Sequence, residues 1–211
     1  VALDDAETSA RAARLAAMAE AARPKDGIPP VYIIGTEVPV PGGALEESLY
    51  IYHHGLVRAL DLGFAPRVIS VGLGLAYNEL IALAEFSRRG LRGKVWSFEA
   101  LPELRQGFRA WLGGDGDPQL TAILDSVCAR VASKLGVPDL KSIAALALAQ
   151  GDLELRELFP ADAGGVVDAG VVFFDAFSNK MSPELWQELD LENNLKALTA
   201  PRSLLCTYAR T

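Results

Sequence analysis

Three acidic residues stand directly after segments that are predicted to be strands. Glu99 follows the second strand of an alternating strand–helix pattern, Asp152 the third and Asp175 the fourth. In a doubly wound sheet, ligands bind outside the carboxyl ends of the strands. We therefore expect these three carboxylates to line one binding edge.

The first strand of this pattern ends in a glycine turn that contains Gly72 and Gly74. Two glycines one residue apart let the backbone turn tightly and approach a ligand closely. A dinucleotide site would have a third glycine where Tyr77 stands, so the pattern disfavours NAD and FAD. A glycine turn with the acid Glu99 following 25 residues after Gly74 suits a nucleoside without a pyrophosphate, such as S-adenosylmethionine.

The predicted cofactor pocket combines this turn with two of the strand-end acids. We expect Glu99 to hold the ribose hydroxyls and Asp152 to lie near the adenine. Each signal alone has a structural alternative, because glycine turns are common and a strand-end acid is often only solvated. The predicted cofactor-binding residues are Gly72, Gly74, Asn78, Glu99 and Asp152.

Asp175 is the candidate for the chemical step, because it emerges from the strongly apolar run 171–174. A carboxylate there can accept hydrogen bonds from an amine and steer its lone pair toward an electrophilic methyl group. An alkylammonium has a pKa of about 10, so a carboxylate or water must help to remove its proton. Phe177 would form an apolar wall beside the substrate. The alternative is that Asp175 caps a turn and Phe177 is core, as we expect for Trp186.

Other polar residues give weaker signals. His53 and His54 are adjacent on a predicted helix and face different ways, so they make a poor metal pair and no metal is expected. A solvated or helix-capping role fits them better. The basic residues of segment 88–94 usually indicate a solvated loop, but they are also the best phosphate-contact candidates in the chain.

The elements that must position these residues follow an α/β pattern from residue 67 onward. Predicted strands cover 67–71, 95–98, 143–149, 166–174 and 203–208, although the alanines and leucines of 143–149 would equally suit a helix. Predicted helices cover 78–88, 100–111, 119–135 and 183–198. Strands separated by helix-length segments indicate a mostly parallel, doubly wound sheet with helices on both faces.

The N-terminal part of the chain differs from this pattern. An alanine-rich helix is predicted over 4–23, a short strand over 31–34 between irregular flanks, and a helix over 44–60. We therefore divide the chain into an N-terminal helix and strand extension, 1–43, and a main domain, 44–211.

Composition limits the classes of function. The 211 residues carry 20 basic and 27 acidic side chains, a net charge of −7, with 50% apolar and 22% charged residues, as in ordinary globular proteins. Two cysteines exclude a disulfide framework and favour a reducing, cytoplasmic setting. No apolar run approaches the roughly 20 residues that cross a bilayer, so no membrane partner is expected. Net acidity disfavours a partner held by a broad electrostatic footprint, although a local basic patch could hold nucleic acid.

Several motifs occur in an order that resembles the MnmC-like tRNA methyltransferases, from about residue 43 to the end. The most specific is Asp-Ala-Phe at 175–177 followed by Pro-Glu-Leu-Trp at 183–186; the others lie at 43–48, 55–56, 72–78, 98–99 and 151–152. The resemblance implies a Rossmann-like methyltransferase that uses S-adenosylmethionine to methylate the aminomethyl group of a modified wobble uridine, with tRNA as partner. It also implies catalytic roles for Asp175 and Phe177 and substrate contacts for Glu47 and Pro183.

The sequence departs from this family at several positions. Ser70 stands where the family has a glutamate, two residues before the first glycine, and Ala76 replaces its third glycine. Further departures are Leu49, Asn179 and Met181, and the last strands of the family are expected to be short or missing. Two alternatives stay open: a methyltransferase that acts on a different small or macromolecular amine, and a non-catalytic binding or scaffold protein.

Overall fold

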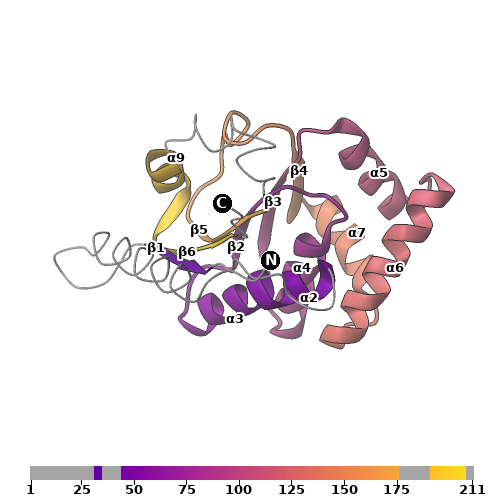
Figure 1. The fold of residues 1–211 in the computed structure, drawn as a ribbon, viewed down its shortest axis with the longest axis horizontal. Helices are drawn as coiled ribbons and strands as arrows, with labels where there is room; N and C mark the ends of the chain where they lie inside the picture. Colours follow the sequence, from indigo (N-terminus) through magenta and orange to yellow (C-terminus); the bar gives the residue numbers. More distant parts are fainter. Residues whose placement is uncertain (1–30, 35–43, 176–190, 208–211) are drawn as a thin grey trace, which may run out of the picture.

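The computed structural model describes residues 31–34, 44–175 and 191–207. Its strands form one six-stranded sheet in the order β1-β6-β5-β2-β3-β4, and every pairing between them is parallel (Figure 1). The strands are β1 (Val31–Ile34), β2 (Arg67–Val71), β3 (Lys94–Phe98), β4 (Leu153–Arg156), β5 (Ala169–Phe174) and β6 (Thr199–Thr207).

The direction in which strands are added reverses beside β2. From β2 the chain proceeds outward through β3 to β4, and then returns to place β5 on the other side of β2. This arrangement is the Rossmann-like, doubly wound α/β fold that the sequence predicts. Ligands of such sheets bind where the order reverses, which here lies between the carboxyl ends of β2 and β5.

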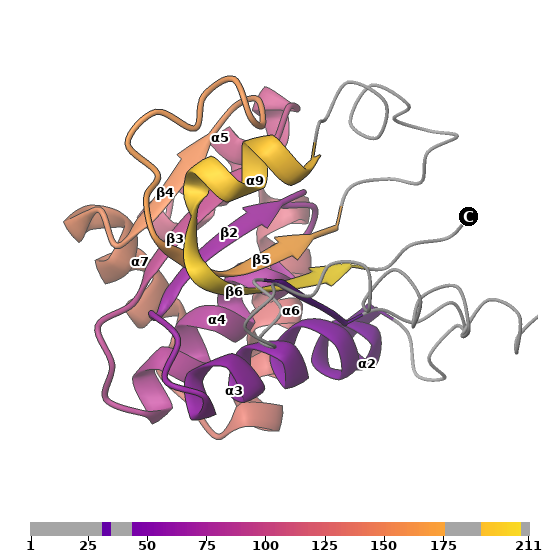
Figure 2. The same cartoon turned by 90° about the vertical axis from the view of Figure 1, so that its left-hand side faces the viewer.

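Most of the helices cover one face of the sheet, and α9 (Leu191–Leu198) lies on the other (Figure 2). The N-terminal helical region on the first face is α2 (Ala44–Ser48), the π-helical turn η1 (Leu49–His53) and α3 (His54–Asp61). The remaining helices are α4 (Tyr77–Arg88), α5 (Pro102–Gly113), α6 (Pro118–Leu135) and α7 (Leu140–Gln150).

The central strand β5 is buried along its whole length, as its apolar run predicts. Its side chains alternate between the two faces, because successive residues of a strand point in opposite directions. Val171 and Phe173 join the core beneath the helices of the first face, whereas Val172 and Phe174 pack on the α9 side with Leu195. Rigid packing on both faces fixes the position of the residue that follows, Asp175.

Segment 143–149 is helical, within α7, so the strand prediction there is wrong. Alanine and leucine are strong helix formers, and Gly151 ends the helix in a left-handed conformation with φ of 72°. The true third strand of the alternating pattern is β4, whose sequence Leu-Glu-Leu-Arg alternates buried and half-buried residues. Its two charged residues and its position at the edge of the sheet explain why its apolar signal is weak.

The other predictions are confirmed where they can be compared. The strand at 67–71 is present with the predicted ends, and those at 95–98, 166–174 and 203–208 are present with other ends. The helix predicted over 44–60 is present but contains the π-helical turn. The helix predicted over 4–23 and the first part of that over 183–198 lie outside the described residues. No helix in the described ranges is long and apolar enough to cross a membrane.

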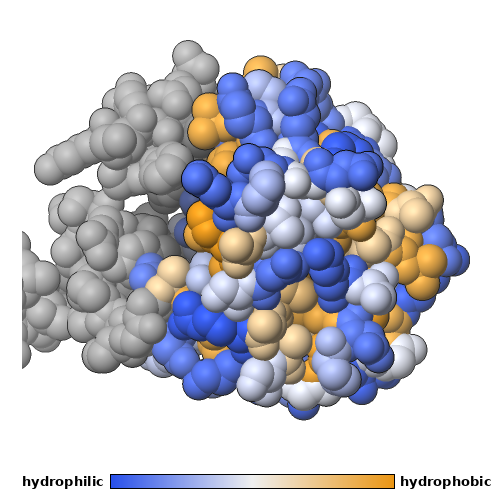
Figure 3. Space-filling model, turned by 90° about the vertical axis from the view of Figure 1, so that its right-hand side faces the viewer, coloured by the Kyte–Doolittle hydropathy of each residue, from blue (hydrophilic) through white to orange (hydrophobic). Residues whose placement is uncertain are grey.

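The outer surface over α5, α6 and α7 mixes hydrophilic and hydrophobic residues (Figure 3). Ile123 on α6 and Leu146 on α7 are among the exposed large apolar side chains. Polar residues separate the apolar areas on this side of the molecule in the space-filling view.

Candidate functional site at the carboxyl edge of the sheet

The turn after β2 has an unusual backbone. Gly72, Gly74 and Ala76 all adopt left-handed conformations, with φ of 96°, 49° and 63°. The glycines tolerate this without strain, whereas the fully buried Ala76 carries a Cβ that costs about 1–2 kcal/mol in that region. The turn is therefore strained at Ala76, the position where the resemblance to the MnmC-like family implies a third glycine.

Glu99 holds this turn to the end of β3. Its Oε2 atom accepts hydrogen bonds from the backbone N–H groups of Leu73 at 3.2 Å and Gly74 at 3.3 Å. Its Oε1 atom accepts one from the N–H of Leu101 at 3.0 Å. A carboxylate offers about four lone-pair positions, so these three donors orient Glu99 and leave capacity for a ligand hydroxyl.

Asn78 and Asp175 meet across the point where the strand order reverses. The side-chain amide of Asn78 donates to Asp175 Oδ2 at 2.9 Å. Asp175 is exposed to solvent at the end of β5, but the protein around its carboxylate still removes enough water to raise its pKa to about 6. The negative charge of Glu47 also raises this pKa, while the hydrogen bond from Asn78 and the nearby Tyr52 hydroxyl oppose the rise.

Tyr52 is a site residue that sequence reasoning missed. Its side chain is 1% exposed, and its ring lies 5.2 Å from that of Phe173, centroid to centroid. Burial and the neighbouring Asp175 carboxylate raise the pKa of Tyr52 far above its ordinary value. Its hydroxyl lies close enough to interact with Asp175, yet within the described residues it has no partner in good hydrogen-bond geometry.

Tyr52 and Glu47 act on the same carboxylate from two consecutive elements. Tyr52 lies in the π-helical turn η1 and Glu47 in the preceding helix α2, and the wider turn of η1 changes where Tyr52 points relative to a continuous α-helix. No spacing rule applied to the sequence would have indicated this turn. The structure thus brings the predicted substrate residue Glu47 into electrostatic range of Asp175.

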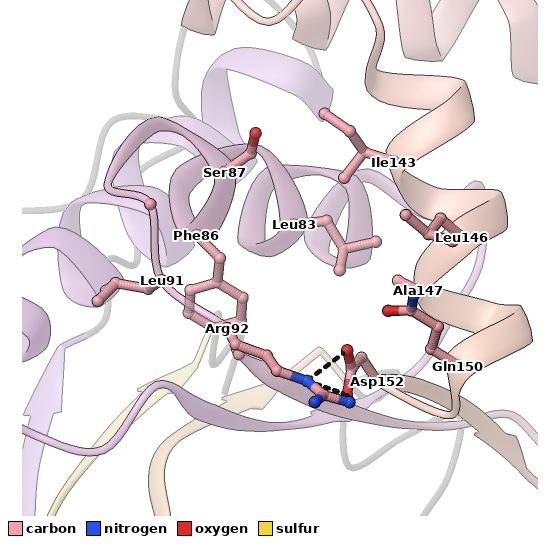
Figure 4. A pocket seen from close by; sticks show the side chains of 12 residues that line it. Leu83, Phe86, Ser87, Leu91, Arg92, Ile143, Leu146, Ala147, Gln150 and Asp152 are labelled. Atoms are coloured by element: carbon pink, nitrogen blue, oxygen red, sulfur yellow. Dashed lines mark hydrogen bonds and ion pairs between the residues drawn. The ribbon is translucent and has the colours of Figure 1, made fainter.

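Asp152 is not at this site, so the prediction that it lies near the adenine is wrong. It precedes β4 and therefore lies at the amino edge of the sheet, opposite the glycine turn. There it pairs with Arg92, whose Nε lies 3.0 Å from Asp152 Oδ2 (Figure 4). Both residues line a surface groove of about 320 Å³ between α4 and α7. The error follows from assigning 143–149 to a strand.

The residue that does follow β4 is Glu157, which sequence reasoning missed together with its partner. Arg105 on α5 donates from Nη2 to Glu157 Oε1 at 3.0 Å and from Nη1 to the carbonyl oxygen of Glu99. Arg105 therefore ties the carboxyl ends of β3 and β4 together. Its position six residues after Glu99, on the helix that follows, is the one sequence signal that could have indicated it.

The basic residues of segment 88–94 are all paired with acids. The carboxylate of Glu85, whose side chain is 3% exposed, forms ion pairs with two arginines of this segment. His53 Nε2 lies 3.0 Å from Glu85 Oε2. The pairs are Arg88–Glu85, Arg89–Glu85, Arg89–Asp61, Arg92–Asp152 and Lys94–Glu154. His53 thus has a structural partner rather than a solvated role. No group of metal-ligating side chains occurs within the described ranges.

Three further predicted positions cannot be placed. Phe177, Pro183 and Trp186 lie outside the described residues. The site that the structure does describe consists of the glycine turn, Glu99, Asn78 and Asp175, with Glu47 and Tyr52 beside them.

Comparison with known families gives two partial matches. Residues 120–211, a range that contains Asp175, match the family model of S-adenosyl-L-methionine-dependent methyltransferases. The prediction of S-adenosylmethionine as cofactor is confirmed at the level of this family model. Residues 1–65 match the model of D-tagatose-1,6-bisphosphate aldolase subunits of the GatZ/KbaZ type. The motif at 43–48 therefore lies within the aldolase-subunit match and outside the methyltransferase match.

Individual proteins of both kinds also match this chain. A D-tagatose 6-phosphate 4-epimerase from Agrobacterium fabrum is 61% identical over 44 residues, which are 20% of this chain and 10% of that enzyme. The MNMC2 structure from Aquifex aeolicus is 25% identical, with 78% of this chain and 50% of that chain covered and a TM-score of 0.46. The structure of the rRNA methyltransferase aviRa from Streptomyces viridochromogenes is 16% identical, with 83% of this chain and 78% of that chain covered and a TM-score of 0.43.

The chain spans about half the length of MNMC2 and a tenth of the epimerase. The fold assignment rests on the strand order and parallel register of this chain, because both structural superpositions are partial.

Proposed function

We propose that this chain is an S-adenosylmethionine-dependent methyltransferase that methylates an amine nitrogen at the point where the strand order reverses. The observation that carries the proposal is the hydrogen bond between Asn78 and Asp175, beside a glycine turn that is held by Glu99. The family match over residues 120–211 supports the cofactor class.

The residues present fit this cofactor. The left-handed backbone at Gly72 and Gly74 lets the chain approach a ligand closely, and Glu99 keeps acceptor capacity for ribose hydroxyls. Asn78 Oδ1 is buried and has no partner within the described residues, so an acceptor is available beside the turn. When bound, S-adenosylmethionine would supply a methyl carbon to the amine nitrogen, and the carbon–sulfur bond would break with its electron pair on sulfur.

Asp175 would bind and deprotonate the acceptor amine. With a pKa of about 6 it is ionised at neutral pH, and it is a stronger base than an ordinary aspartate. Asn78 fixes one of its oxygens, which leaves the other to accept from the amine. The nearby charge of Glu47 would favour a cationic substrate, and positioning of this kind supplies most of the rate in such a transfer.

The acceptor that we propose first is the aminomethyl group of a modified wobble uridine in tRNA. The support is the resemblance of segments 175–177 and 183–186 to the MnmC-like enzymes, together with a carboxylate-rich site suited to an amine. Because the cations at the amino edge are paired with acids, tRNA would have to approach the carboxyl edge. A different small or macromolecular amine is the alternative acceptor.

The test separates binding from catalysis. Calorimetry with S-adenosylhomocysteine should show binding, and the same titration with NAD should not. The protein is then incubated with methyl-labelled S-adenosylmethionine and either tRNA that carries the unmethylated aminomethyl nucleoside or a panel of small amines.

Label in the methylaminomethyl nucleoside would support the full proposal, and label only in small amines would replace the acceptor. Cofactor binding without transfer to any amine would indicate a non-catalytic binding protein. Binding of NAD alone would overturn the cofactor assignment. An epimerase or aldolase activity is not proposed, because the matched segment spans a tenth of the epimerase.

A further inference from the structure

A buried carboxyl group lies beneath the glycine turn and takes no part in the site described above. It belongs to Glu79, the third residue of α4, and its side chain is fully buried. Ser97 on β3 donates from Oγ to Glu79 Oε1 at 2.7 Å. Ser97 is the register partner of Ser70 on β2, so the two serines lie side by side under this carboxyl group.

The hydrogen bonding of this group is incomplete. Glu79 Oε2 and Ser70 Oγ are both buried, and neither has a partner in good geometry within the described residues. Buried polar atoms in folded proteins nearly always have partners, and here the Ser70 hydroxyl and the second oxygen of Glu79 have only each other nearby, without good geometry.

The place of Ser70 in the sequence suggests what the carboxyl group of Glu79 does. The resemblance to the MnmC-like family implies a glutamate at this position, two residues before the first glycine of the turn, and this chain has Ser70 instead. Two residues of a strand span about 7 Å, so a charge beside Ser70 acts within that range of Gly72. Glu79 places a carboxyl group beside Ser70 from the first turn of α4, and so restores an acid that the strand lacks.

Within the described residues, no salt bridge to Glu79 is present. Loss of water raises its pKa to about 7, and the negative charge of Asp175 at the end of β5 adds to this rise. The hydrogen bond from Ser97 and the nearby Ser70 hydroxyl oppose the rise of this pKa. Arg88, Arg89 and His53 are directed to Glu85, farther along α4. A cation brought by a ligand would therefore be the first charge to balance Glu79.

We propose that Glu79 is a positioning residue that supplies the negative charge for the ammonium group of the cofactor, in place of the acid missing at Ser70. This inference rests on the proposed function, because it requires a cofactor with an amino-acid part at the glycine turn. Glu79 acts from below the turn, through the electrostatic field and the Ser70–Ser97 pair, while Glu99 serves the ribose.

Two ligands that differ only in the amino-acid part test this. S-adenosylhomocysteine carries the ammonium group, and 5′-methylthioadenosine lacks it. At pH 8, Glu79→Gln should raise the Kd for S-adenosylhomocysteine by about ten-fold or more, in the range for a lost charge-assisted interaction. The Kd for 5′-methylthioadenosine should stay within about two-fold, because that ligand has no cation for Glu79 to balance. Glu103→Gln, at an exposed acid of α5, is the matched control and should change neither value.

A double variant that moves the carboxyl group from position 79 to position 70 provides a second test. Ser70→Glu combined with Glu79→Gln returns the charge to the strand and should recover affinity for S-adenosylhomocysteine. In the unaltered protein, that affinity should increase from pH 6.5 to 8, while affinity for 5′-methylthioadenosine stays level.

Loss of affinity for both ligands in Glu79→Gln, unchanged affinity for both, or failure of the swap to recover binding would each overturn the role of Glu79. If the unaltered protein binds neither ligand, the proposed function fails as well, and the two failures are thereby distinguished.

Discussion

The side-chain amide of Asn78 lies 2.9 Å from Asp175 Oδ2, and this hydrogen bond joins the first turn of α4 to the end of β5. The two residues are 97 positions apart in the chain and come from elements on either side of the point where the strand order reverses. The backbone N–H of Asp175 also donates to the carbonyl oxygen of Val71 at 2.9 Å. Backbone and side chain together therefore fix this carboxylate against the glycine turn.

The Asp175→Asn variant should keep the bond to Asn78 but lose the base. If Asp175 deprotonates the amine, single-turnover methyl transfer should fall by roughly 10²-fold or more, the range for a positioned proton-transfer group. The rate of the unaltered protein should decline as pH falls below about 6, since the carboxylate is then protonated, and this decline should be absent in the variant. The Kd for S-adenosylhomocysteine should change little in the variant. A stable variant with unchanged turnover would remove Asp175 from the mechanism.

The Glu99→Ala variant should weaken both the cofactor site and the fold. Three backbone N–H groups lose their acceptor, so we expect a loss of about 1–3 kcal/mol in cofactor binding and about 1 kcal/mol in the free energy of unfolding. Calorimetry and denaturant unfolding measure the two effects. Glu103→Ala, at an exposed position of α5, serves as the control and should change either value by less than about 0.5 kcal/mol. Unchanged cofactor affinity in Glu99→Ala would mean that Glu99 only supports the turn.

Glu79 should make the stability of the protein depend on pH. Its pKa is raised from 4.5 to about 7, so the folded state binds more protons than the unfolded state between these values. The stability that it contributes is complete below pH 4.5 and is lost as pH rises through about 7, by about 3 kcal/mol.

Glu79→Gln should remove this dependence, so the difference in unfolding free energy between variant and unaltered protein should grow from pH 5 to pH 8 in favour of the variant. Denaturant unfolding at several pH values measures it. A constant difference across that range would contradict the raised pKa.

Gly55 on α3 should not tolerate a side chain while Cys206 is present. A Cβ added at Gly55 would lie 2.3 Å from Cys206 Sγ on β6, so Gly55→Ala should cost about 1–3 kcal/mol through overpacking. Cys206→Ala removes that sulfur and leaves the next contact, Leu204 Cδ2, at 3.3 Å. In this background Gly55→Ala should cost far less, and a double-mutant cycle from denaturant unfolding measures the coupling. Additive effects would show that α3 does not approach β6 as closely as described.

The central strands and the glycine turn could be predicted from the sequence because their signals are local. The apolar run before Asp175 and the spacing of Gly72 and Gly74 each determine a position without reference to distant residues. At the carboxyl edge that they form, Glu99 accepts from the backbone of Gly74 and Asn78 donates to Asp175.

The remaining features depend on partners far away in the chain. Edge strand β4 has an amphipathic sequence that becomes a strand only by pairing with β3. Because the sequence did not indicate this strand, Asp152 was predicted at the wrong edge of the sheet. Tyr52 reaches the site through a π-helical turn that no periodicity indicates. The basic cluster likewise looks free in the sequence, because its acidic partners, apart from Glu85, are 28 to 60 positions away.

The pairing of β1 has a consequence for the order in which the molecule assembles. Val31 pairs with Ser203, so the first described strand finds its only sheet neighbour in the last one, 172 positions later. During synthesis from the N-terminus, β2, β3 and β5 can associate while β1 has no strand to join. Closing so long a separation loses more chain entropy than pairing nearby strands, and contacts of this range slow folding. We therefore expect β1 to be the last strand added to the sheet and the first to leave it when the protein opens locally.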